Sequence, residues 1–265
     1  MKPANRFLRV AAAILAAVLF AIPASAAEVH VMISGGFSAA YKALGPYFEK
    51  YAGSKLVTVE GPSMGTTPQA IPNRLERGEQ ADVIIMVGEA LQGLINRGKV
   101  IPDSRVDLAR AKIAMAVRTG ATKPDISTLE AFKRTVLAAK SIAYSDSASG
   151  VYLETVLFPR MGISEQLKGK ARMIPAEPVG RVVARGEAEI GFQQLPELKP
   201  VEGIDIVGLI PEEAQKVTVF SAGIAVGTKN YEGARELIKF LSSDFTREAI
   251  AKAGMEPVAT GKTAY

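Results

Sequence analysis

The chain has 265 residues, with no cysteine, no tryptophan and a single histidine, His30. A chain of this length can bury a core without cross-links, and these counts argue against disulfides, thiolate chemistry, the usual zinc sites and Ser–His or Cys–His catalysis. Lysine and arginine number 32 against 27 acidic residues, but three of these cations lie in the first nine residues, and removing them leaves 29 against 27. This balance argues against a nucleic-acid partner.

The N-terminal segment 1–26 has the pattern of a secretory signal peptide. Three basic residues precede an uncharged apolar run, 10–22, which is too short to span a bilayer as a helix, and small residues follow at 24–26. We expect cleavage after Ala26, which removes 26 of 265 residues and leaves a periplasmic chain of 239.

Short apolar runs then alternate with helical patterns. We expect strands over 29–33, 56–60 and 82–87, and helices over 39–51, over a segment ending near Gly78, and over 89–97. Gly45-Pro46 predicts a kink or a break in the first helix. Such alternation indicates a mainly parallel sheet covered by helices, with ligands gathered at the carboxyl ends of its strands.

A second block of the same kind begins after Lys112. We expect strands over 113–118, 141–143, 172–174, 190–194 and 204–209, and helices over 128–140, 151–161, 178–185, 232–242 and 246–253. Residues 217–226 form a long apolar run interrupted by Ser221 and Gly223. No linker rich in Pro, Ser or Gly separates the blocks, so we expect the chain to cross between two domains through strands, with the final helices returning to the first domain. The sequence therefore predicts two Rossmann-like α/β domains with a hinge and a cleft: residues 28–110 with 222–265, and residues 111–221.

Four loop-to-helix junctions carry glycine, and three of them also carry hydroxyl groups. They are Ser34-Gly35-Gly36, Ser63-Met64-Gly65-Thr66-Thr67, Ser147-Ala148-Ser149-Gly150 and Pro178-Val179-Gly180. Each offers the backbone N–H groups that a helix start leaves without partners, and each block contributes two. Converging in one cleft, they would hold an anion by dipoles and hydrogen bonds instead of by lysine or arginine. The alternative is four independent caps on ordinary helices.

The order of these elements resembles the type II periplasmic solute-binding proteins, and in particular the molybdate-binding proteins of ABC transporters. The resemblance runs from Val29 to Pro257, and four segments carry it: Gly78-Glu79-Gln80-Ala81-Asp82-Val83, Ser149-Gly150-Val151-Tyr152, Glu187-Ala188-Glu189-Ile190-Gly191 and Leu237-Ile238-Lys239-Phe240-Leu241. It implies a hinged protein that captures a small oxyanion or polycarboxylate for an ABC permease.

Matched position by position, the resemblance implies ligand contacts at the four junctions and at one strand end. Gly35 and Gly36 stand where the family has two serines, Ser149 and Val179 fall where it presents N–H groups, and Gln194 replaces a tyrosine. Two glycines would enlarge the site, and amide side chains suit a planar carboxylate better than a compact tetrahedral oxyanion. The expected binding residues are Ser34, Gly35, Gly36, Ser63, Gly65, Thr66, Ser147, Ser149, Gly150, Val179, Gln193 and Gln194.

The first loop, from Ser34 to Tyr41, and the segment Gly61-Pro62-Ser63-Met64-Gly65 also resemble the periplasmic aconitate isomerases, an enzyme class of similar fold. Such an enzyme moves a double bond in a tricarboxylate by shifting a proton, which needs a base near a carbon acid and donors for an enolate-like charge. Asp146 and Glu154 also fit an ordinary loop cap and a solvated helix face. The candidate bases are Glu60, Asp146, Tyr152 and Glu154.

We therefore expect an exported monomer that closes on a small anion. The leading function is ligand capture for an ABC-type uptake system, and the alternative is interconversion of cis- and trans-aconitate on the same scaffold. A receptor or sensor subunit that neither transports nor reacts is a third class. The sequence carries no P-loop, dinucleotide fingerprint or metal-ligand pair, so we expect no cofactor and no metal.

Overall fold

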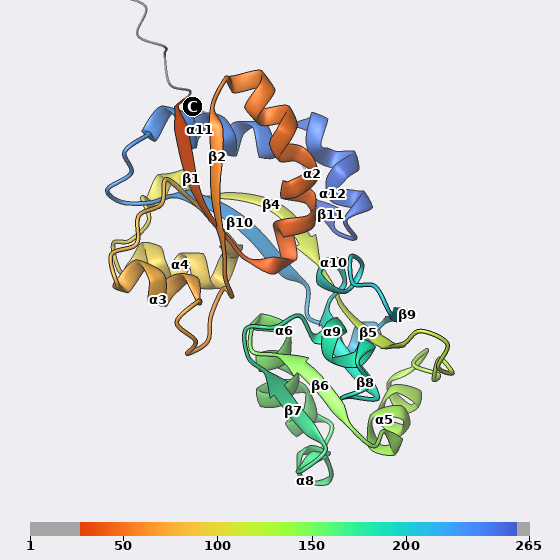
Figure 1. Cartoon of the computed structure of the whole chain (residues 1–265). Coiled ribbons are helices and arrows are strands. Elements are labelled where there is room, and N and C mark those ends of the chain that lie inside the picture. The colour runs from red at the N-terminus through yellow and green to blue at the C-terminus, as the bar shows by residue number, and fades with distance from the viewer. Residues whose placement is uncertain (1–26, 259–265) are drawn as a thin grey trace, which may run out of the picture.

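The structure is a computed structural model that describes residues 27–258. The expected signal peptide, residues 1–26, lies outside the described residues. Two sheets, each with its own helices, stand in separate lobes (Figure 1), so the prediction of an α/β protein built from two such units is confirmed. Within residues 27–258, no helix combines the length and the apolar character needed to cross a membrane.

The first lobe is built on a six-stranded sheet with the order β11 (Glu256–Pro257), β4 (Val106–Ala111), β10 (Thr218–Ile224), β3 (Val83–Val87), β1 (Glu28–Ile33) and β2 (Lys55–Glu60). β1 is parallel to both β2 and β3. β10 runs antiparallel between β3 and β4, and β11 is antiparallel to β4.

The second lobe is built on a five-stranded sheet with the order β7 (Ala171–Ile174), β6 (Ile142–Ser145), β8 (Ile190–Gln194), β5 (Ile113–Arg118) and β9 (Ile204–Leu209). β6 is parallel to β7 and β8, whereas β5 is antiparallel to β8 and β9. Both sheets are therefore mixed, and the expectation of mainly parallel sheets was wrong. The crossings between the lobes explain this. β5 and β10 are the first strands after the two crossings, and each is antiparallel to a strand that belongs to a β-α unit of its sheet, β8 and β3 respectively.

The chain passes between the lobes twice, at Lys112 and through residues 210–217. The first sheet thus holds strands from 28–111 and 218–257, and the second holds strands from 113–209. The expected boundary between residues 221 and 222 falls inside β10, which is one continuous strand of the first sheet.

Helices cover both faces of the first sheet, and the final helices pack beside α2 in the first lobe. α2 begins four residues earlier than predicted and runs through Pro46 as one helix, so the predicted break is absent. The helices are α2 (Gly35–Ala52), α11 (Tyr231–Leu241) and α12 (Arg247–Lys252) on one face and α3 (Ile71–Glu76) and α4 (Gly88–Asn96) on the other, with the 3-10 turns η2 (Pro102–Ser104) and η5 (Asp244–Thr246).

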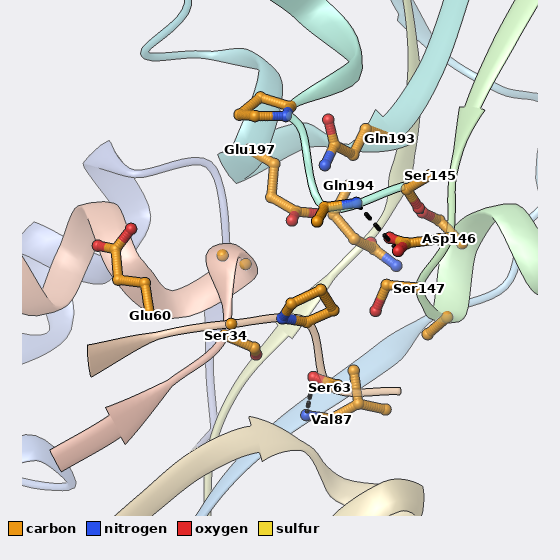
Figure 2. Close-up of a pocket in the computed structure, with 18 of the residues that line it drawn as sticks. Ser34, Glu60, Ser63, Val87, Ser145, Asp146, Ser147, Gln193, Gln194 and Glu197 are labelled. Atoms are coloured by element: carbon orange, nitrogen blue, oxygen red, sulfur yellow. Dashed lines mark hydrogen bonds between the residues drawn. The ribbon is translucent and has the colours of Figure 1, made fainter. Parts of the chain in front are cut away.

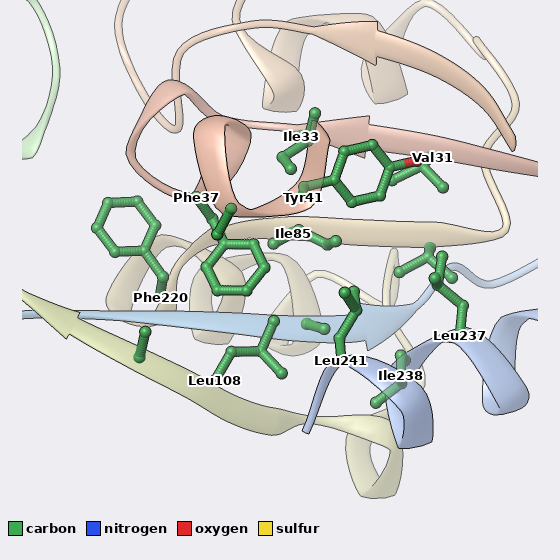
Figure 3. Packing of buried hydrophobic residues seen from close by; sticks show 14 of the residues in the cluster. Val31, Ile33, Phe37, Tyr41, Ile85, Leu108, Phe220, Leu237, Ile238 and Leu241 are labelled. Atoms are coloured by element: carbon green, nitrogen blue, oxygen red, sulfur yellow. The ribbon is translucent and has the colours of Figure 1, made fainter. Parts of the chain in front are cut away.

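Side chains along β1 and β3 alternate between the two faces of the sheet, as pleated strands require. Val31, Ile33 and Ile85 belong to the cluster under α2 and α11 (Figure 3), whereas Met32 and Ile84 pack on the opposite face with α4. Burial on both faces fixes the register of these strands and hence the positions of their carboxyl ends. The α2 side chains in the cluster share one helix face, at the spacing i, i+3, i+4, i+7 and i+11: Phe37, Ala40, Tyr41, Leu44 and Phe48.

The second lobe has shorter helices. α6, the π-helical turn η3 and α7 follow one another without a gap and form one helical run over 148–160, whose Leu153, Leu157 and Phe158 enter the core of the lobe. The elements are α5 (Leu129–Ala138), α6 (Ala148–Tyr152), η3 (Leu153–Leu157), α7 (Phe158–Arg160), α8 (Ser164–Leu167), α9 (Val179–Ala184), α10 (Leu195–Leu198) and the 3-10 turn η4 (Glu212–Ala214).

Candidate functional site

A cavity of about 220 Å³ lies between the lobes (Figure 2). Its walls are the segments that follow β1, β2 and β3 in the first lobe and β6, β7 and β8 in the second. Parallel strands end at one edge of their sheet, so these segments meet there. The lining residues are Ser34, Gly35, Gly36, Glu60, Gly61, Pro62, Ser63, Gln69, Val87, Ser145, Asp146, Ser147, Ala148, Ser149, Ala176, Glu177, Pro178, Gln193, Gln194, Glu197 and Phe220.

Eight of the twelve expected binding residues line this cavity: Ser34, Gly35, Gly36, Ser63, Ser147, Ser149, Gln193 and Gln194. The other four lie outside its lining: Gly65, Thr66, Gly150 and Val179. Gly150 serves packing, because a Cβ there would lie 1.7 Å from the carbonyl oxygen of Ser145. The Val179 N–H donates to Oε1 of Gln193 at 2.9 Å, so this amide is already engaged within the protein.

Three of the four expected junctions are helix starts, and the fourth is a loop. Ser34, Ser147 and Pro178 are the N-caps of α2, α6 and α9. α3 begins only at Ile71, so the stretch from Ser63 to Thr67 does not start a helix. Ser63 still reaches the cavity, where its Oγ accepts a hydrogen bond of 3.0 Å from the Val87 N–H (Figure 2).

The start of α2 offers donors to an anion from the first lobe. The N–H groups of Gly35 and Gly36 have no acceptor among the described residues, because the first turn of a helix leaves its N–H groups unpaired. The Ser34 hydroxyl beside them is buried and has no partner within residues 27–258. Amides, a hydroxyl and the positive end of an 18-residue helix favour a carboxylate or another oxyanion.

The two glycines do not enlarge the cavity, contrary to the expectation from the sequence. A Cβ on Gly35 would lie 2.5 Å from Oε1 of Glu197, and a Cβ on Gly36 would lie 2.1 Å from Cζ of Phe220. The protein's own side chains therefore fill the space that the glycines leave. As a result, a carboxyl group of the second lobe rests against the start of α2 in the first.

Two of the four carboxyl groups that line the cavity are paired with cations. Glu60 lies 2.6 Å from Nζ of Lys42 and accepts a hydrogen bond of 2.6 Å from Oγ of Ser38. Burial raises the pKa of Glu60, but these two partners outweigh it and hold the pKa below its ordinary value. The hydrogen bond from Arg185 to Glu177, 2.6 Å long, likewise lowers the pKa of Glu177.

The other two carboxyl groups, Asp146 and Glu197, have no cation within ion-pair distance among the described residues. Burial raises the pKa of Glu197 to about 7; hydrogen bonds from the Gln193 side chain and the Gln194 backbone oppose this rise, and the charge of Asp146 adds to it. Burial also raises the pKa of Asp146, although its Oδ2 accepts a hydrogen bond of 3.0 Å from the Ala176 N–H. Two neighbouring carboxyl groups in different environments form an acid–base arrangement.

Two of the four candidate bases from the sequence, Tyr152 and Glu154, do not line the cavity. The Tyr152 hydroxyl donates to the carbonyl of Ala214 at 3.1 Å. Glu154 is exposed and hydrogen-bonds to Tyr144, whose pKa burial and this carboxylate raise to about 12.

Glu197 is the residue that sequence reasoning missed. The available signal was its place, three residues after the end of β8, at the edge where β6 also ends. The expected glutamines do line the site, but the Nε2 of Gln194 donates to Oγ1 of Thr218 at 2.8 Å, and Gln193 bonds to Val179. None of the described residues that line the cavity is lysine, arginine or histidine, and residues 27–258 contain no cluster of acidic and histidine side chains suited to a metal ion.

Comparison with known proteins gives the class of this chain. The family model of the bacterial extracellular solute-binding proteins matches residues 29–256, and the chain belongs to this family. The solved periplasmic molybdate-binding protein of Azotobacter vinelandii shares its fold, with a TM-score of 0.69 at 21% identity over 88% of this chain and 100% of that one. The expected type II periplasmic binding-protein fold is therefore confirmed, and membership of an extracellular family implies export.

Two relatives of known function are similar in sequence. The chain is 57% identical over 228 residues to an aconitate isomerase from a Pseudomonas species, and the aligned region covers 86% of this chain and 87% of the relative. It is 28% identical over 192 residues to the molybdate-binding protein ModA of Azotobacter vinelandii, and this aligned region covers 69% of this chain and 71% of that protein.

Proposed function

We propose that this chain interconverts cis- and trans-aconitate by an allylic proton shift in the cavity between its lobes. The observation that carries the proposal is Glu197, a carboxyl group that lines the cavity, has no cationic partner among the described residues and has a pKa of about 7. General acid–base catalysis works best with a group whose pKa lies near the working pH. The 57% identity to an aconitate isomerase supports this assignment.

The chemistry matches the groups that are present. Aconitate carries a methylene carbon and a vinyl carbon on either side of its central carbon, and each of the three carbons bears a carboxylate. Removing a methylene proton gives a carbanion whose charge spreads into a carboxylate and across the allyl system, and protonation at the former vinyl carbon completes the shift. The N–H groups of Gly35 and Gly36, at the start of α2 in the cavity lining, would stabilise this charge on a carboxylate without a metal ion.

Capture of a small anion for an ABC permease is the second candidate. The neutral donors at the start of α2 favour it, because amides and hydroxyls hold an oxyanion without an ion pair, and the fold is that of a molybdate-binding protein. Capture alone does not require an unpaired carboxyl group in the site, whereas the proton shift does. The role of Glu197 therefore distinguishes the two candidate functions.

The test uses the chain without its expected signal peptide, with trans-aconitate as substrate and conversion to the cis isomer followed by proton NMR. We expect turnover by the wild type and a loss of about 10³-fold in Glu197→Gln, which keeps the shape of the side chain but cannot exchange a proton. Glu202→Gln, an exposed residue outside the cavity lining, is the matched control and should keep full activity. Binding of aconitate without conversion by the wild type would overturn the proposal in favour of capture.

A further inference from the structure

We infer that Asp146 and Glu197 act as a reciprocal pair, in which one carboxyl group removes the proton in one direction of the isomerisation and the other removes it in the reverse direction. This inference rests on the proposed function and adds a second proton-transfer group to it. Its basis is the placement of the two groups at one edge of the second sheet.

The topology brings the two carboxyl groups together. β6 and β8 are parallel neighbours, with Tyr144 opposite Phe192, so Asp146 follows β6 at the level where β8 ends at Gln194. Glu197 follows in the short helix α10. Adjacent strands lie about 4.8 Å apart, and Figure 2 shows the two carboxyl groups on either side of Gln194. One ligand in the cavity can therefore meet both.

Hydrogen bonds hold each carboxyl group in place. Oδ2 of Asp146 accepts from the Ala176 N–H at 3.0 Å. Gln193 hydrogen-bonds to Glu197, and the Val179 N–H donates to Oε1 of Gln193 at 2.9 Å, which orients the amide so that its NH₂ group is the donor toward Glu197. Val179, expected to bind the ligand through its N–H, thus serves to position Glu197.

Several other polar groups of the lining are engaged with partners of their own. Glu60 is paired with Lys42, and Glu177 is paired with Arg185. The hydroxyls of Ser145 and Ser149 lie 3.0 Å apart and share a hydrogen bond. Among the described residues that line the cavity, Asp146 and Glu197 are the carboxyl groups without a cationic partner.

The proton balance closes with two groups and no co-reactant. In one direction, an ionised carboxylate takes a methylene proton, the C–H electron pair forms the new double bond, and the old double bond takes a proton at its vinyl carbon from the other carboxyl group, which becomes ionised. The reverse direction uses the same steps with the roles exchanged. One proton is shared between the two groups before and after the reaction.

The test is solvent exchange in deuterium oxide, with each pure isomer followed by NMR. In Glu197→Gln, Asp146 should still exchange the methylene hydrogens of one isomer at a rate within about tenfold of wild-type turnover, while isomerisation falls by about 10³-fold. Asp146→Asn should show the same separation with the opposite isomer. Glu154→Gln, an exposed carboxyl outside the cavity lining, is the control and should isomerise at the wild-type rate. Calorimetric binding of aconitate checks that each variant has a folded site.

The possible outcomes separate this inference from the proposed function. If one variant loses exchange from both isomers while the other isomerises within about tenfold of the wild type, a single base carries the proton and the reciprocal pair is wrong. Retention of the substrate hydrogen in the wild-type product would also contradict it, because the proton removed and the proton returned belong to different groups. A wild type that binds aconitate but neither exchanges nor isomerises it would instead refute the proposed function, and this inference with it.

Discussion

The two lobes supply different chemistry to one cavity. The first lobe contributes Ser34, Gly35 and Gly36 at the start of a long helix, and its one acidic lining residue, Glu60, is paired with Lys42. The second lobe contributes both carboxyl groups that lack a cationic partner among the described residues, Asp146 and Glu197. The lobes are similar in architecture, yet one presents neutral donors and the other presents acids.

Under the proposed function, this difference is how a binding fold acquires a reaction. Backbone amides hold an anion and do not titrate, so a lobe made of them can only bind. A buried carboxyl group beside them adds proton transfer without altering the anion site. Anchoring and proton transfer can therefore be changed separately, and the following predictions test that separation, beginning with the largest expected effect.

Gly35→Ala should disturb the contact where the lobes meet. Its Cβ would lie 2.5 Å from Oε1 of Glu197, the end of a flexible side chain, so the carboxyl group is displaced while the fold survives. We expect turnover of trans-aconitate to fall by about 100-fold and the free energy of unfolding to change by less than about 1 kcal/mol. Gly93→Ala, also in a helix but with no atom within 4 Å of its Cβ, is the control and should keep full activity. Equal activity of the two variants would contradict the placement of Glu197.

Glu197→Gln should change the dependence of stability on pH. The pKa of Glu197 is raised to about 7 in the folded protein, above the 4.5 of an unperturbed glutamate, so the folded state binds more protons between these values. The stabilising contribution of the neutral acid is thus complete below pH 4.5 and is lost as the pH rises through about 7. The variant, which stays neutral, should exceed the wild type in free energy of unfolding by about 2 kcal/mol at pH 8, after allowance for partial exposure. Urea unfolding at pH 4.5 and pH 8 measures this, and parallel behaviour of the two proteins would contradict it.

Ser34→Ala and Ser63→Ala should separate binding from folding within the first lobe. The Ser34 hydroxyl has no partner in the described part of the chain, so we expect its loss to raise KM by about tenfold with little change in stability. Oγ of Ser63 accepts from the Val87 N–H, and its removal leaves a buried amide unpaired. We expect this second variant to lose about 1–2 kcal/mol of unfolding free energy. Steady-state kinetics and thermal unfolding of both variants measure these two effects. A loss of stability in Ser34→Ala would show a structural role for that hydroxyl.

Glu60→Gln should have the smallest effect. The side chain is about half exposed (49%) and its charge is met by Lys42, and such ion pairs contribute about 0–1 kcal/mol. We expect kcat to stay within about twofold of the wild type, in contrast to the loss in Glu197→Gln. A fall in kcat as large as that of Glu197→Gln would place the proton-transfer group in the first lobe.

Strong local patterns made much of the fold predictable. β5, β8 and β9 have the predicted bounds, because each is a mainly apolar stretch with polar, Gly or Pro residues within two positions of its ends. β4 was not predicted, because Asp107 and Arg110 interrupt its apolar pattern and its identity as a strand comes from pairing with β10. The antiparallel direction of β5 and β10 was also not predicted, because direction follows from where the chain crosses between lobes and not from the local pattern.

The candidate site was predictable where local chemistry defines it. Gly and Ser at strand ends marked the segments around Ser34 and Ser147, and both line the cavity. Glu197 could not be found this way, because an acidic residue in a short helix resembles a surface residue. Its place beside the start of α2 depends on Gly35, which is distant in the sequence and leaves room for the carboxyl group.

The position of β10 has a consequence for the order in which the molecule can be assembled. This strand lies between β3 and β4 near the middle of the first sheet, yet it follows every strand of the second lobe in the chain. The second lobe is formed by one continuous segment and can fold as soon as that segment is available. The first lobe cannot join β3 to β4 until residues 218–224 arrive, so the cavity between the lobes can be completed only after the second lobe has been synthesised.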